Sequence, residues 1–241
     1  MKKIHRFALM LAAVMLVANL TACGGKSNNE PTVTVVNSSS GTIKASGVVS
    51  EQNYALSGGP YTVKTSGISM TNGKCELIIS PADDGSCTVA VDDNAEITVN
   101  INEDARRIEI SGASGKMYEG LSLKITVNAA VEAIDVDGAT EVSYDAGTAE
   151  QVGITASGAC QITASGACRT GEYTLSGAVQ MKAYGLECED LTVSASGACS
   201  AEVYAAQSLT AKVSGTSSVQ YDGNPQDTSI DVSGVSSAEA R

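Results

Sequence analysis

A short phrase built on glycine, most often Ser-Gly-Ala, returns at a near-constant interval through the C-terminal half of this 241-residue chain. Its successive glycines lie 20, 19, 20, 18 and 19 residues apart. They are Gly138, Gly158, Gly177, Gly197, Gly215 and Gly234. One further copy, Ser165-Gly166-Ala167, falls inside a single period. A fixed period near 20 residues indicates stacked copies of one small structural unit.

Within each period apolar and polar residues alternate, as in Leu191 to Gly197 and again in Ala198 to Tyr204. Such alternation is typical of strands that are buried on one face, and serine-glycine supplies the bend between two strands. One unit of this size cannot bury a core, but copies stacked about 4.8 Å apart can. The sequence therefore predicts an all-β fold, a right-handed parallel β-helix or β-solenoid with coils of about 18–20 residues. A leucine-rich horseshoe is excluded because its L-x-x-L-x-L-x-x-N pattern is absent.

The half before the repeats is rich in strands but less regular. Alternating or apolar runs separated by turn residues predict five strands. They lie at 61–65, 76–80, 87–91, 96–101 and 107–111. We expect residues 41–241 to form one domain, with the most regular repeats from 138 to 241.

The repeats and their flanking phrases, LTVSASGACSAEVY and LTAKVSGTSSVQYDG, resemble the auto-transporter adhesin head, or GIN domain, family found in Bacteroidetes lipoproteins. The resemblance is clear over 120–241 and weaker over 41–119. It implies a β-helical adhesin head, and it carries no catalytic residues over to this chain.

Residues 1–22 have the pattern of a signal peptide, with basic residues at the start and a 14-residue, largely apolar stretch from Phe7 to Leu20. That stretch is shorter than a membrane-spanning helix requires. It ends in Leu20-Thr21-Ala22-Cys23, which resembles the bacterial lipobox and implies cleavage before Cys23 and lipidation of that cysteine. Residues 23–40 then comprise the lipidated cysteine and a polar, flexible tether. We expect an exported lipoprotein anchored to the outer membrane, on the cell surface.

Without the signal peptide the chain is strongly acidic. Twelve Lys and Arg oppose 27 Asp and Glu, a formal charge of −15. This charge favours solubility outside the cell and disfavours nucleic acid as a partner, because phosphates would be repelled.

Six cysteines follow Cys23, and several pairings are open. Cys75 and Cys87 flank a turn and are a possible disulfide across a hairpin. Cys168 and Cys188 lie one period apart and either meet or remain buried thiols. Cys160 and Cys199 lie two coils apart, beyond disulfide reach, and Val179 fills the same repeat position between them, which indicates small buried hydrophobes.

No cofactor or metal is expected. The one histidine, His5, lies in the signal peptide, and no C-x2-C pair suggests zinc. Acidic pairs at Asp83-Asp84, Asp92-Asp93 and Glu103-Asp104 offer oxygen ligands for calcium, but turns favour aspartate for local hydrogen bonds.

Four tyrosines, Tyr144, Tyr184, Tyr204 and Tyr221, follow their repeat glycines by six or seven residues. Stacked coils would align them in a ladder along one side. The ladder would either bind sugar rings or a protein or stabilise one coil on the next.

These features predict a non-catalytic adhesion or recognition module for a glycan or a protein. One alternative is a β-helical polysaccharide lyase or hydrolase, although the acids Glu141, Glu202 and Asp222 are scattered one to a coil. Another is a structural spacer of the envelope. The last coil would expose an open strand edge, so we also expect either self-association through that end or a capping strand.

Overall fold

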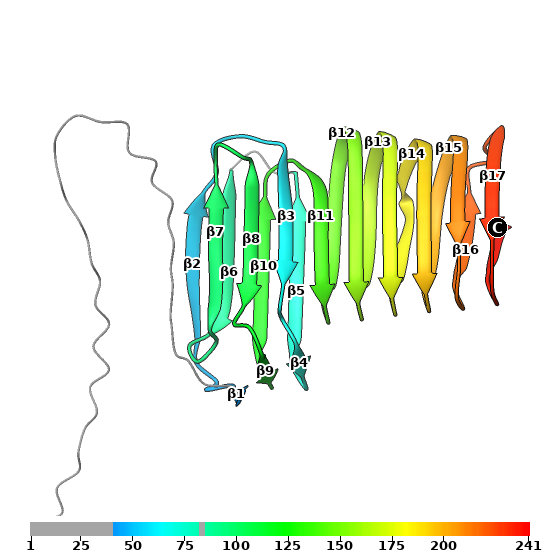
Figure 1. Cartoon of the computed structure of the whole chain (residues 1–241). Helices are drawn as coiled ribbons and strands as arrows, with labels where there is room; N and C mark the ends of the chain where they lie inside the picture. The colour runs from blue at the N-terminus through cyan, green and yellow to red at the C-terminus, as the bar shows by residue number, and fades with distance from the viewer. Residues whose placement is uncertain (1–40, 82–84) are drawn as a thin grey trace, which may run out of the picture.

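The computed structural model describes residues 41–81 and 85–241, and over these ranges the chain is a β-solenoid of about five turns without a helix (Figure 1). The predicted fold class is confirmed. The signal peptide, Cys23, the tether and the turn at Asp83-Asp84 lie outside the described residues.

The regular coils are built by long strands that continue through a bend and pair in parallel with the same strand of the next coil. Figure 1 shows these strands side by side toward the C-terminal end. The long strands are β12 (Glu141–Gly158), β13 (Gln161–Gly177), β14 (Gln180–Gly197) and β15 (Ser200–Val213). The shorter β11 (Val131–Gly138) precedes them, and the shorter β16 (Ser218–Asp222), β17 (Asp227–Val232) and β18 (Ser237–Ala240) follow.

The N-terminal half extends both walls of the solenoid with shorter strands, as the sequence predicts. One wall continues from β11 through β3 (Tyr61–Ser66) and β8 (Arg107–Gly112) to β7 (Ile97–Asn102). The other continues from β12 through β5 (Lys74–Ser80) and β10 (Ser122–Asn128) to β6 (Ser86–Asp92) and β2 (Val49–Ala55). The pairs β7–β8, β6–β10 and β2–β6 are antiparallel. A small separate sheet joins β1 (Gly41–Lys44), β9 (Lys116–Glu119) and β4 (Met70–Thr71).

The core is a set of columns in which equivalent residues of successive coils stack. One column contains Val142, Ile162, Met181, Ala201 and Val219, which are register partners and are all buried. Burying one Val, Ile or Met side chain contributes about 1.5–3 kcal/mol. Each coil therefore gains its stability by covering the coil before it.

A column of glycines forms the first bend of every coil. The six repeat glycines have φ between 80° and 97°, a conformation that favours glycine. At each step the chain also comes close to the previous coil: the Ala178 N–H donates to the Gly158 carbonyl at 2.8 Å. A Cβ added at Gly177 would lie 2.6 Å from that same oxygen. The interval between repeats in the sequence is thus the number of residues from one such bend to the next.

The off-beat copy of the repeat marks a second bend. Gly166 has φ of 115°, and a Cβ there would lie 2.7 Å from the carbonyl oxygen of Gly147 in the preceding coil. Gly147 itself has φ of 59°. The extra Ser-Gly-Ala is therefore part of the coil geometry.

Cys160 and Cys199 are small buried residues, as predicted, and their thiols also make local contacts. Cys160 Sγ lies 3.1 Å from the Ser157 carbonyl oxygen, and Cys199 Sγ lies 3.2 Å from that of Ser196. At the same repeat position in the next coil, Ser217 Oγ donates to the Gly197 carbonyl at 3.2 Å.

Cys75 and Cys87 do not face each other across a hairpin, so that prediction is wrong. Strand β10 is inserted between β5 and β6, so Cys75 is the partner of Leu123 and Cys87 is the partner of Val127. Both cysteines are free and buried. Burial raises the pKa of Cys75 to about 11 and that of Cys87 to about 12.

The carboxylate of Asp92 is buried and accepts hydrogen bonds that fix a loop. Its donors are the Ser46 N–H and hydroxyl and the Gly47 N–H, each at 2.9 Å, and the Asn94 N–H at 3.1 Å. Its oxygens are thus engaged locally, in line with the turn interpretation of the acidic pairs. Among the described residues no three or more His, Cys, Asp or Glu side chains group to hold a metal ion.

Strands β17 and β18 pair only on the side toward β15 and β16 within the described part of the chain. Ile230 and Val232, register partners of the buried Ala211 and Val213, are 38% and 40% exposed. The capping strand is not seen there, and self-association stays a prediction.

The glycine column predicts a large loss of stability when one of its glycines gains a methyl group. Replacing Gly177→Ala should lower the free energy of unfolding by at least about 2 kcal/mol, because alanine is strained at positive φ and its Cβ meets the Gly158 carbonyl. Denaturant unfolding followed by circular dichroism measures the change. Gly153→Ala is the control, since a Cβ at Gly153 lies 3.6 Å from its nearest neighbour, the Cβ of Ala133. Equal losses in the two variants would contradict the proposed role of the bend.

The hydrogen-bonded carboxylate of Asp92 predicts that part of the protein's stability is lost in acid. Burial alone would raise the pKa of Asp92, but hydrogen bonds from Ser46, Asn94 and Gly47 outweigh it and lower the pKa. A lowered folded pKa gives stability that is present above the unfolded value of about 3.9 and is lost as pH falls through the folded pKa.

The variant Asp92→Asn should therefore lose about 1–3 kcal/mol at neutral pH and show a smaller further loss between pH 4 and pH 2. Asp93→Asn, at the exposed neighbouring position, should retain the acid dependence of the unmodified chain. Urea unfolding at several pH values checks both, and an unchanged acid profile for Asp92→Asn would exclude this role.

Candidate functional site

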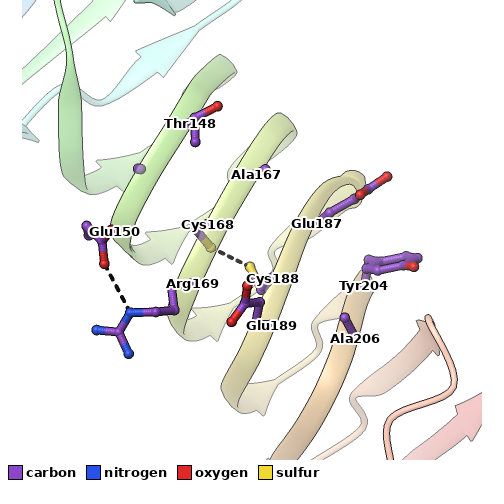
Figure 2. A pocket seen from close by; sticks show the side chains of 11 residues that line it. Thr148, Glu150, Ala167, Cys168, Arg169, Glu187, Cys188, Glu189, Tyr204 and Ala206 are labelled. Carbon is purple, nitrogen blue, oxygen red and sulfur yellow. Dashed lines mark hydrogen bonds and ion pairs between the residues drawn. The ribbon is translucent and has the colours of Figure 1, made fainter.

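A groove of about 350 Å3 crosses four successive strands, β12 to β15, next to the second bend (Figure 2). It is lined by Thr148, Ala149, Glu150, Ala167, Cys168, Arg169, Glu187, Cys188, Glu189, Tyr204 and Ala206. Each strand contributes two or three neighbouring residues, so the groove is a product of coil stacking.

Two rows of outward-facing side chains form the walls of the groove. In the first row the register partners Thr148, Ala167, Glu187 and Tyr204 follow one another from β12 to β15. The second row contains Glu150, Arg169 and Glu189. Strand alternation turns the residues between the rows toward the core, and these are Ala149, Cys168, Cys188 and Ala205.

Polar contacts hold both ends of the second row. Arg169 Nε donates to Glu150 Oε2 at 3.0 Å, and Gln207 Nε2 donates to Glu189 Oε2 at 3.3 Å. The hydrogen bond to Glu150, together with its charge, raises the pKa of Arg169. Three glutamates face one arginine in the groove, so its charge is negative.

Tyr204 closes the first row at the β15 end. Its ring is half-buried and stands opposite Glu187 on the neighbouring strand. Figure 2 shows Tyr204 and Glu187 at one margin of the groove and Glu150 and Arg169 at another. The aromatic face can stack on an apolar ring surface of a ligand, and the carboxylates beside it can accept hydrogen bonds from hydroxyl or amine groups.

The four tyrosines expected to form a ladder do not align. Tyr144 is the partner of Ala164, Tyr204 of Glu187 and Tyr221 of Val203. The register shifts between Thr163 and Ser165 and again after Ala183. Tyrosines at similar distances from their repeat glycines therefore do not point to the same side of the solenoid.

The tyrosines also differ in environment. Tyr144 is 2% exposed in the core and donates to the Val131 carbonyl at 2.6 Å, and Tyr221 packs against the core. Tyr184 faces outward, but its hydroxyl donates to Gln220 Oε1 at 3.1 Å and the Arg241 guanidinium lies 4.8 Å from its ring centroid. Of the four, Tyr204 lines the groove.

Of the acids considered for catalysis, Glu141 lies far from the other two, whereas Glu202 and Asp222 both lie close to Tyr184. Glu141 pairs with Lys74 at 3.1 Å, at the opposite end of the repeat stack from Asp222, which lies 3.8 Å from Arg241. Glu202 lies in register between Lys182 and Gln220. The acids of the groove were not singled out from the sequence. The signal available was the Glu187-Cys188-Glu189 alternation, which places two carboxylates on the outer face of one strand.

The family described as "Putative auto-transporter adhesin, head GIN domain" matches residues 66–225. No curated protein matches the chain. Among solved structures, one described as a putative adhesin from Bacteroides fragilis is 18% identical, covers 83% of this chain and 100% of its own, and has a TM-score of 0.56. This likeness shows the fold.

Two structures from Parabacteroides distasonis also cover 83% of this chain and 100% of their own. One is described as a putative adhesin, with 17% identity and a TM-score of 0.45. The other is described as a putative lipid binding protein, with 12% identity and a TM-score of 0.45.

Residues 41–81 and 85–241 contain no helix with the length and apolar character needed to cross a membrane.

Proposed function

Because this chain belongs to the auto-transporter adhesin head GIN domain family, as its Ser-Gly-Ala repeats predicted, we propose that it is a non-catalytic adhesion protein that holds a glycan or a protein segment in the groove across β12 to β15. Family membership supports an adhesion-type role. The observation that carries the proposal is the groove itself, in which carboxylates, an arginine and an aromatic ring converge from four coils.

The groove is preformed, which favours binding of a ligand. The side chains of its walls belong to strands that are joined from coil to coil by backbone hydrogen bonds, with no loop between them. A ligand would order few backbone dihedrals on binding, so little of the interaction free energy is lost to entropy.

The chemistry of the walls fits a neutral ligand rich in hydroxyl groups, or one bearing amines. The carboxylates of Glu150, Glu187 and Glu189 accept hydrogen bonds, and the Tyr204 ring offers a flat apolar face. Anionic polymers would meet repulsion from the same carboxylates and from the acidic chain as a whole, which argues against nucleic acid.

The remainder of the proposal concerns location. The sequence around Cys23 supports a lipid anchor, and residues 24–40 would hold the solenoid away from the outer membrane on the cell surface. Two or more acyl chains give stable anchoring where one is marginal. Self-association through the edge of β17 and β18 would add further copies of the groove to one assembly.

To test binding, the full chain purified in detergent is passed over immobilised plant and host polysaccharides, mucin and matrix proteins, and polymer chain length is recorded in the same samples. We expect retention with unchanged chain length. Tyr204→Ala should weaken binding about tenfold, the loss of roughly 1.4 kcal/mol that one stacked ring supplies. Tyr184→Ala is the matched control, a half-buried tyrosine on the adjacent strand outside the groove.

The other outcomes are equally informative. Shortened polymer would replace the adhesion proposal with a polysaccharide-degrading enzyme. Equal loss in the two tyrosine variants would move the binding site away from the groove. No retention on any member of the panel would favour a structural role in the envelope.

The anchoring proposal predicts a covalent modification. Cys23→Ser should abolish incorporation of labelled palmitate into the chain in growing cells, because the thiol that would carry the acyl chains is removed. Cys160→Ser, a cysteine inside the solenoid, is the control and should leave labelling unchanged. Labelling of Cys23→Ser equal to that of the unmodified chain would contradict lipidation at this residue.

A further inference from the structure

Two thiols meet beneath the groove. Cys168 on β13 and Cys188 on β14 are direct register partners, and their sulfur atoms lie 2.7 Å apart (Figure 2). Both are buried, at 4% and 0% exposure. Parallel strands about 4.8 Å apart place such partners within the Cα separation that a disulfide spans.

The surrounding columns leave room for the sulfur pair. Gly171 occupies a core column whose neighbours on the adjacent strands are Val152 and Leu191. A Cβ at Gly171 would lie 2.8 Å from Cys188 Sγ, so the missing side chain provides the space that this sulfur fills. The column of the cysteines themselves ends in alanine on both sides, at Ala149 and Ala205.

We propose that Cys168 and Cys188 form a disulfide that links two successive coils under the groove. The other buried cysteines lack this arrangement. Cys160 and Cys199 are separated by the coil that carries Val179, and Cys75 and Cys87 are separated by strand β10.

The local chemistry identifies Cys188 as the attacking group. Cys188 has a contact that its partner lacks, since the Tyr173 hydroxyl lies 3.1 Å from Cys188 Sγ. Hydrogen bonding with Cys168 and with Tyr173 lowers the pKa of Cys188 against the opposing effect of burial. A thiolate is the reactive form in thiol–disulfide exchange.

The oxidant is an external disulfide, which is reduced to two thiols. The Cys188 thiolate attacks one of its sulfurs, and the bond between the two external sulfurs breaks to release the first thiolate. Cys168 then loses its proton to that thiolate and attacks the Cys188 sulfur of the mixed disulfide, which releases the second external thiolate. Because both side chains are buried in the finished fold, the exchange takes place while coils are still adding to the stack.

The bond would close a loop of one coil and fix the floor between the two rows of the groove. It would stabilise the solenoid by restricting the unfolded chain. The disulfide forms whatever ligand the groove binds, so its test is independent of the adhesion proposal.

The test uses the full chain carrying Cys160→Ser and Cys199→Ser. Trypsin then yields peptides 125–169 and 183–212 with one cysteine each, Cys168 and Cys188. The chain is refolded in a mixture of reduced and oxidised glutathione, free thiols are alkylated in denaturant, and the digest is analysed by mass spectrometry without reduction. We expect the two peptides joined, at a mass 2 Da below the sum of the free thiol forms.

Reductant should lower the unfolding temperature of this protein by about 6–12 °C. Adding Cys168→Ser should remove the joined peptides and make the unfolding temperature insensitive to reductant. Alkylation of both Cys168 and Cys188 in the refolded protein, or joined peptides without any response of the unfolding temperature, would overturn the proposal of a stabilising link.

Discussion

The close contact between glycines of successive coils is the constraint on which the rest of the structure depends. Each repeat glycine turns the chain at positive φ, and the carbonyl of every one from Gly138 to Gly215 accepts an N–H from the next coil. A side chain there would be strained and would collide with the backbone of the coil before it. The bend therefore sets both the length of a coil and the register of the stack. Core columns, outward rows and the groove follow from that register.

The groove shows how a repeated scaffold makes a local site. The second bend, at Gly147 and Gly166, brings the outward rows of β12 to β15 beside a column of small inward residues. Neighbouring coils then supply different outward residues, a threonine, an arginine, glutamates and a tyrosine. The stacking is common to all coils, whereas the chemistry belongs to these four strands. The disulfide that we propose would hold the middle two coils together directly beneath it.

The repeat was sufficient to predict the fold class, the period and the buried role of Cys160 and Cys199, because these depend on local alternation and on glycine. Strand order was not predictable in the same way. The insertion of β10 between β5 and β6 depends on contacts between residues more than 30 positions apart, such as Cys87 with Val127. The prediction of a tyrosine ladder was wrong because it used only the distance of each tyrosine from its repeat glycine. Side chains along a strand alternate between the two faces, so the distance from the nearest buried residue decides the side. Tyr144 lies two residues after the buried Val142 and points inward, whereas Tyr204 lies one residue after the buried Val203 and points outward.

The outward rows have a consequence for how such a protein can diversify. Glu150, Arg169, Glu187 and Glu189 face away from the packed columns, and their side chains are exposed. Substitutions at exposed strand positions cost little stability, whereas a change at a repeat glycine is severe. Mutations can therefore accumulate in the groove while the coil geometry is retained, and the chemistry of the groove can change without a compensating change elsewhere in the fold.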